Sequence, residues 1–76
     1  MIGYSDLTWR EGKLYHGKKD TSVSLIKDKE HDFMYWLEWN FTEPLKSINP
    51  YNLENAKDNG KKLYLGYINE STENGT

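Results

Sequence analysis

Residues 32–41 read Asp-Phe-Met-Tyr-Trp-Leu-Glu-Trp-Asn-Phe, and this stretch decides the fold. It has the composition of a β-strand, in which neighbouring side chains point to opposite faces of a sheet. One row of alternate residues is apolar throughout and predicts the core face: Phe33, Tyr35, Leu37, Trp39 and Phe41. The other row places Met34 and Trp36 among polar residues. A small two-layer domain has nothing obvious to cover these two side chains.

Three shorter strand patterns precede this stretch, each bounded by turn-forming residues. They cover 7–10, 14–16 and 21–27, with turns at 11–13, 17–20 and 28–32. These connections are too short for parallel crossovers. The sequence therefore predicts an antiparallel meander of three to four strands.

The C-terminal half carries apolar residues at helical spacing. The stripe, which predicts one helix, comprises Leu53, Ala56, Gly60, Leu63, Tyr64, Tyr67 and Ile68. Asn52 suits its N-cap, or Asn49 with Pro50 at the first helical position. Because glycine costs about 1 kcal/mol inside a helix, we expect Gly60 to face the sheet where a tryptophan needs room. The competing interpretation, a hairpin turn at Asn59-Gly60 followed by a strand, leaves the start of the stripe without a role.

These patterns together predict an α+β fold, a small antiparallel meander with one C-terminal helix packed on one face. With 76 residues, the chain has room for one domain. We expect a single ββββα domain over residues 1–68 and a flexible polar tail over residues 69–76.

Short motifs mark this layout: L-x-W at 7–9, L-Y-x-G at 14–17 and N-L-x-x-A-K-D at 52–58. In them the chain resembles a group of small phage and prophage proteins, over most of residues 7–60. It departs from their pattern at Gly60 and in the additional aromatic residues of 33–41. The resemblance implies the fold and a phage origin, and it implies no activity.

Composition bears on the compartment. The sequence has no cysteine, which fits a reducing environment. Its N-terminus lacks the pattern of a secretion signal, and no apolar run approaches a membrane span. We expect a cytoplasmic protein, in the host cell cytoplasm if it is phage-encoded.

The sequence offers no recognisable catalytic or metal-binding constellation. His16 and His31 are its two histidines, and neither has a second ligand at metal-binding spacing. No serine stands in a nucleophile elbow. We therefore expect a protein that is not an enzyme and that uses no cofactor or metal.

The candidate contact surface is the sheet face that the helix leaves open. Trp, Tyr, Met and Arg are enriched at the cores of protein interfaces. The residues predicted to gather on this face are Trp36, Met34, Tyr15, Ile26 and Arg10. The alternative is that these side chains are tolerated half-exposed or are covered by residues 42–51.

Two hypotheses for function follow from this surface. In the first, the face docks on a protein partner, such as a host or defence protein. In the second, single-stranded nucleic acid stacks on the aromatic rings, and its backbone follows Arg10 together with Lys13, Lys18, Lys19, Lys27 and Lys29. The net charge of −2 argues against the second. Closure of the same face by a second copy of the chain is a third possibility.

Overall fold

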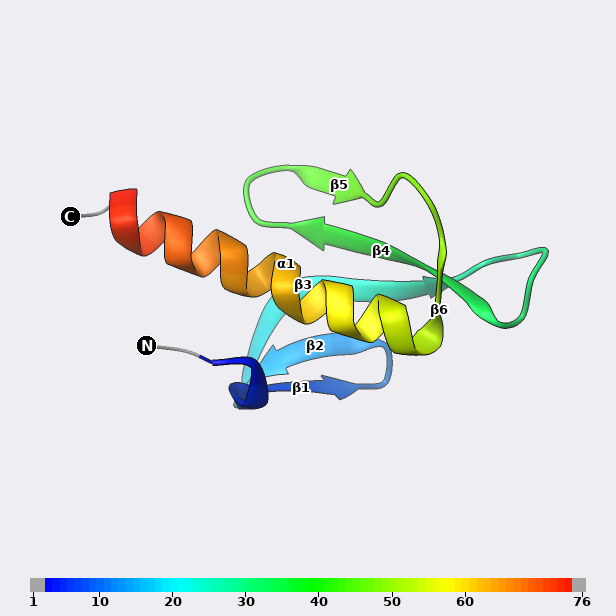
Figure 1. The fold of residues 1–76 in the computed structure, drawn as a ribbon, viewed down its shortest axis with the longest axis horizontal. Helices are drawn as coiled ribbons and strands as arrows, with labels where there is room; N and C mark the ends of the chain where they lie inside the picture. The colour runs from blue at the N-terminus through cyan, green and yellow to red at the C-terminus, as the bar shows by residue number, and fades with distance from the viewer. Residues whose placement is uncertain (1–2, 75–76) are drawn as a thin grey trace.

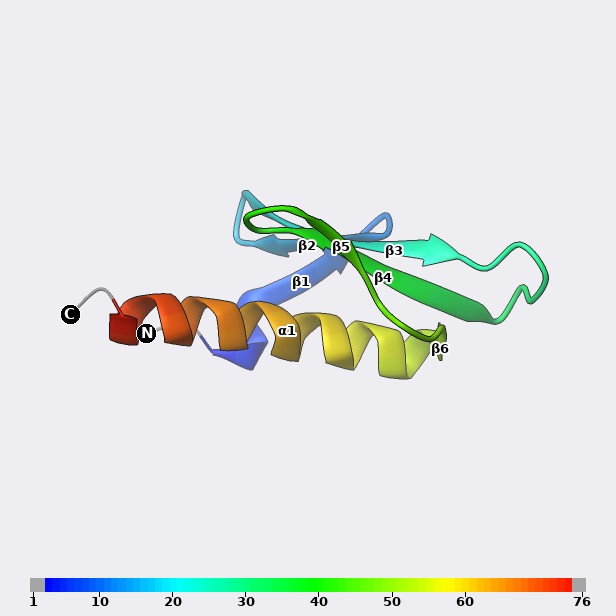
Figure 2. The same ribbon diagram turned by 90° about the horizontal axis from the view of Figure 1, so that it is seen from above.

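The computed structural model describes the backbone of residues 3–74 and the side chains of residues 3–70. Figures 1 and 2 show an antiparallel sheet with one long helix along one of its faces, which confirms the predicted α+β fold. The elements in chain order are η1 (Tyr4–Asp6), β1 (Leu7–Arg10), β2 (Lys13–His16), β3 (Lys19–Lys27), β4 (Met34–Asn40), β5 (Pro44–Lys46), β6 (Tyr51–Asn52) and α1 (Leu53–Asn74).

The sheet has six strands, more than the three to four predicted. Strands β1 to β5 lie side by side in chain order, and β6 also pairs with β4. The extra strands both lie on the outer edge of β4, with β5 opposite Glu38–Asn40 and β6 opposite Met34 and Tyr35. They have three and two residues, too short to show a period of two in the sequence.

Two irregularities shape the first half of the sheet. The β1–β2 hairpin turns through Glu11 and Gly12, which have φ of 50° and 79°, as expected for a two-residue hairpin turn with left-handed residues. Strand β3 bulges opposite β2, where Ser22 has φ of 71° and donates its backbone N–H to the Asp20 carboxylate at 2.8 Å. The bulge lets the buried Thr21 hydroxyl donate to the Leu14 carbonyl at 2.9 Å.

The core lies between the sheet and α1. Its buried apolar residues come from five elements: Leu7, Leu14, Val23, Leu37, Ala56 and Tyr64. The predicted core row of β4 is confirmed at Leu37, and Trp39 and Phe41 pack against the core. The prediction is wrong for Phe33, which precedes β4 and is 67% exposed. Residues 28–33 form a loop instead of extending the strand, so Phe33 lies outside the layered part of the fold.

Helix α1 begins as predicted, with Asn52 as its cap. The Asn52 side-chain oxygen accepts the backbone N–H of Asn55 at 2.8 Å. Gly60 is buried within the helix, so the alternative of a hairpin turn at this position is wrong. A Cβ on Gly60 would lie 2.5 Å from Cζ2 of Trp9, which confirms that this glycine makes room for a tryptophan.

The helix departs from the prediction at its C-terminal end and in the burial of its first residue. It continues to Asn74, past the domain boundary expected at residue 68. Residues 69–74 of the expected tail are therefore helical, and residues 75–76 lie outside the described residues. Leu53, the first residue of the predicted stripe, is 41% exposed. The buried part of the stripe starts one turn later, at Ala56.

Candidate functional site on the open face of the sheet

The side of the sheet away from α1 is uncovered (Figure 2), and we call it the open face. Side chains alternate along each strand, so the neighbours of buried core residues point to this side. Strand pairing and burial place the following residues there: Arg10, Lys13, Tyr15, Ser24, Ile26, Met34, Trp36, Glu38 and Lys46.

Trp36 is the largest side chain of the open face, and three neighbours fix its position. Ile26 lies directly opposite it on β3. The indole N–H donates to the Asp28 carboxylate at 2.9 Å. The Lys46 ammonium lies 4.6 Å from the centroid of the ring, within the range of a cation–π interaction. The ring is therefore half-buried and held in one orientation.

Asp28 connects Trp36 to the β3–β4 loop. Besides the indole, its carboxylate accepts the backbone N–H groups of Glu30 and His31 and lies 3.0 Å from Nδ1 of His31. The hydrogen bond from Trp36 and then the one from His31 lower the pKa of Asp28 below its usual value of 3.8. The Asp28 carboxyl group is therefore ionised at neutral pH, and the ionised form accepts hydrogen bonds more strongly than the neutral form.

Tyr15 forms a second aromatic position at the other end of the open face. The Arg10 guanidinium lies 4.5 Å from the centroid of the tyrosine ring and donates a hydrogen bond to the Gly17 carbonyl. Arg10 is thus held between the ring and the β2–β3 turn. An open hollow next to this pair is lined by Arg10, Glu11, Tyr15 and Lys18.

The two aromatic positions are separate. Between them a polar row crosses the sheet from Lys13 through Ser24 and Glu38 to Lys46, each paired with the next across neighbouring strands. The structure therefore brings Trp36 together with Ile26, and Tyr15 with Arg10, but it does not join all the predicted residues into one apolar patch. Met34 is half-buried at the end of β4, opposite Asn52.

The lysines of the nucleic-acid hypothesis do not form one track. Of these, Lys13 belongs to the polar row of the open face. Lys18 and Lys19 lie at the β2–β3 turn, whereas Lys27 and Lys29 lie at the opposite end of β3. Lys27 is also 3.7 Å from the carboxylate of Asp32. A nucleic-acid backbone that ran from Lys18 and Lys19 to Lys27 and Lys29 would pass the carboxylate-bearing residue Glu38.

Sequence reasoning missed two groups of residues. The first, Lys46 and Asp28, positions Trp36; Lys46 reaches the ring only because β5 pairs with β4, and β5 was not predicted. The second is the exposed apolar pair Leu45 and Ile48, which are 46% and 90% exposed. Their apolar character was visible in the sequence, but their exposure was not.

Comparisons with protein-family models, with curated proteins and with solved structures found no match. Among residues 3–70, no three His, Asp or Glu side chains are grouped so that they could hold a metal ion. Within the described part of the chain, no helix has both the length and the apolar character needed to cross a membrane.

Proposed function

We propose that this chain is a small binding protein that docks on another protein through its open face. The observation that carries the proposal is the fixed position of Trp36 on an uncovered sheet, between the Asp28 carboxylate and the Lys46 ammonium. The chain would act by occupying its partner, without chemistry of its own. The resemblance to phage and prophage proteins suggests a host or defence protein as that partner and the host cytoplasm as the place.

The residues of the open face suit the centre of a protein interface. Trp, Tyr and Arg dominate the residues whose truncation costs most binding free energy. A side chain that already has one orientation loses less conformational entropy when it is buried by a partner. Trp36 is held by Asp28, and Arg10 is held by the Gly17 carbonyl. The two aromatic positions can therefore serve as preformed anchors, with the polar row between them setting specificity.

A protein fits this face better than single-stranded nucleic acid. Stacking bases would have to displace Lys46 from Trp36 and Arg10 from Tyr15, because these cations lie over the rings. Glu38 stands in the middle of the face. The face thus offers charges of both signs, which a protein surface can match with its own.

Capture from a host lysate tests the proposal. The immobilised chain is compared with Trp36→Ala and with Ile48→Ser, which removes an exposed apolar side chain from the other side of the fold. The proposal predicts one captured protein that the wild type and Ile48→Ser retain and that Trp36→Ala loses. A captured protein that all three retain equally would contradict docking through this face.

The nucleic-acid alternative is tested in parallel with a fluorescent single-stranded oligonucleotide. Nucleic-acid binding falls steeply as salt rises from about 50 to about 200 mM, whereas a protein contact anchored on Trp36 should depend much less steeply on salt. Salt-sensitive oligonucleotide binding that is lost in Trp36→Ala would favour the alternative and overturn the proposed function.

A further inference from the structure

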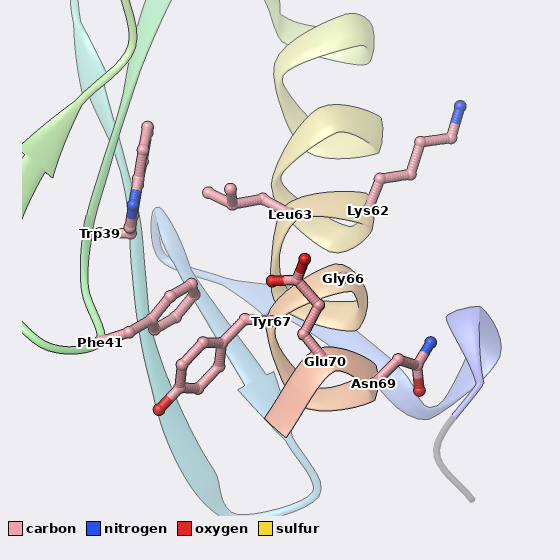
Figure 3. A pocket seen from close by; sticks show the side chains of 8 residues that line it. All are labelled: Trp39, Phe41, Lys62, Leu63, Gly66, Tyr67, Asn69 and Glu70. Atoms are coloured by element: carbon pink, nitrogen blue, oxygen red, sulfur yellow. The ribbon is translucent and has the colours of Figure 1, made fainter. Parts of the chain in front are cut away.

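A groove runs along α1 on the helix side of the sheet, away from the open face. It consists of two adjoining hollows of about 600 and 690 Å³ that share Trp39, Lys62 and Leu63. Figure 3 shows the first hollow, in which Trp39 and Phe41 extend from the sheet and Leu63 and Tyr67 from α1. The rings of Phe41 and Tyr67 stack with their centroids 4.2 Å apart. Leu45 and Ile48 line the second hollow and are largely exposed. We call this feature the α1 groove.

Gly66 marks the place where a second helix can come closest to α1. It is exposed on the groove side of the helix, and a Cβ built there would meet no atom within 4 Å. Gly60, by contrast, is filled from the sheet side by Trp9. The absence of a side chain at Gly66 is therefore not required by the packing within the chain. Small residues at helix crossings allow close approach of the two backbones, as the small-residue interfaces of helix pairs show.

The charges on either side of Gly66 are arranged for one particular partner. Lys62 lies four residues before Gly66, and Glu70 lies four residues after it. Residues four apart lie on the same face of a helix. If a second copy of α1 packs antiparallel on the first with the two-fold axis at Gly66, Lys62 of each copy faces Glu70 of the other. A parallel pair would place like charges opposite each other.

Both charged side chains are available for this contact. Lys62 has a partner in its own chain, Asp58 at 3.0 Å, but the pair is exposed and its side chains are 67% and 41% accessible. Exposed ion pairs of this kind contribute little free energy, so the ammonium can turn to a second copy. Glu70 has no ion pair among the described residues, and Figure 3 shows its carboxylate beside the groove.

The length of α1 points to the same conclusion. The helix projects beyond the ends of the strands at its C-terminus (Figures 1 and 2). Among the side chains of residues 53–70, packing on the core extends to Ile68, and the helical backbone continues to Asn74. Helical turns draw most of their stability from packing against other elements. An antiparallel copy would supply such packing, because it places the body of one α1 beside the projecting end of the other.

We propose that the chain forms a two-fold homodimer in which two copies of α1 pack antiparallel along the α1 groove, crossing at Gly66 with reciprocal Lys62–Glu70 pairs. Leu45 and Ile48 on the groove rim supply apolar surface for the second copy to cover. The dimer leaves both open faces exposed, so it would present two docking surfaces. This inference does not depend on the proposed function, because it needs only the chain itself.

Sedimentation velocity over a range of concentrations tests the dimer with purified protein. The wild type should change from monomer to dimer as its concentration rises. Lys62→Glu and Glu70→Lys should each weaken association by at least about tenfold, since like charges then face each other across the axis twice. Mixing the two variants should restore association, because in the mixed dimer the two reversed positions face each other with opposite charges and the two unaltered positions do the same. Lys57→Glu makes the same change of charge on the opposite side of α1 and should have no effect.

Gly66→Leu provides a test that separates the dimer from folding. The substitution places a bulky side chain at the crossing, and its Cβ would meet no atom of its own chain within 4 Å, so it should abolish the dimer while the helical circular dichroism signal is retained. A wild type that stays monomeric at every concentration would overturn the proposal. A dimer that survives Gly66→Leu and both charge reversals would also overturn it, and dissociation by Trp36→Ala alone would assign the contact to the open face.

Discussion

Substituting alanine at the two glycines of α1 should change stability in opposite directions. Both substitutions replace a glycine inside a helix. The higher helix propensity of alanine should raise the free energy of unfolding by about 1 kcal/mol in each case. They differ in what the new methyl group meets. At Gly66 it meets no atom within 4 Å, whereas at Gly60 it would lie 2.5 Å from Cζ2 and 3.0 Å from Cη2 of Trp9. The comparison therefore isolates the cost of packing at Gly60.

That cost follows from how firmly Trp9 is held. Carbon atoms in contact normally lie about 3.5–4.0 Å apart, so the methyl group would overlap the indole ring by about 1 Å. The ring cannot swing away freely, because its N–H donates to the Lys57 carbonyl at 3.0 Å and Leu37 also borders the site at 3.2 Å. Overpacking of this kind costs about 1–3 kcal/mol. Gly60→Ala should therefore be about 0–2 kcal/mol less stable than the wild type, and Gly66→Ala about 1 kcal/mol more stable.

Thermal unfolding followed by circular dichroism measures this difference. It is carried out at a concentration at which sedimentation shows only monomer. About 1–3 kcal/mol between the two variants corresponds to a difference in Tm of at least about 4 °C for a domain of this size. In a Trp9→Leu background the indole atoms are gone, so Gly60→Ala should there become stabilising. Equal shifts for the two glycines, or a Gly60→Ala cost that persists without the indole, would refute the packing described for Trp9.

Three further predictions concern the core, the β3–β4 loop and pH. Thr21→Val should lower the free energy of unfolding by about 1–3 kcal/mol in urea titrations, because it leaves the buried Leu14 carbonyl without its donor; an unchanged midpoint would contradict the importance of this bond. Phe33→Ser should change the free energy of unfolding by no more than about 0.5 kcal/mol, whereas Leu37→Ala should lower it by about 2–5 kcal/mol. Similar losses for both variants would show that Phe33 is a core residue after all. The folded pKa of Asp28 lies below its ordinary value of 3.8, so its stabilising contribution is complete above that value and is lost as pH falls through the lowered pKa. Between pH 7 and about pH 3 the wild type should consequently lose more stability than Asp28→Asn; equal losses in thermal scans would exclude this role of Asp28.

The parts of the fold that could be predicted from the sequence are those with several consistent local signals. The helix combined an asparagine cap, an apolar stripe and one glycine that needed a bulky neighbour, and the structure shows all three. The first four strands had alternation and turn residues at each end. Strands β5 and β6 showed neither alternation nor flanking turn residues, because they form by pairing with the edge of β4 and not through a pattern of their own.

The candidate surface was predictable only in part, for a related reason. Alternation placed Trp36 on the open face with Ile26 among its possible neighbours, and the pairing of β3 with β4 puts these two residues opposite each other. It could not show that Lys46 and Asp28 hold the tryptophan, because both contacts depend on β5 and on the loop before β4. Alternation also led to the wrong prediction that Phe33 belongs to the core. In the structure, Asp28 accepts hydrogen bonds from the backbone N–H groups of Glu30 and His31, which fixes a loop just before Phe33.

The decisive measurement for docking through the open face is the affinity of the captured protein for the wild-type chain, Trp36→Ala and Ile48→Ser, titrated at about 50 and about 200 mM salt. Truncation of an anchoring tryptophan typically costs 2 kcal/mol or more, so Trp36→Ala should bind at least about 30-fold more weakly. Ile48→Ser should bind like the wild type, and salt should change none of these ratios. Equal affinities for Trp36→Ala and the wild type would show that the partner binds elsewhere and would contradict docking through the open face.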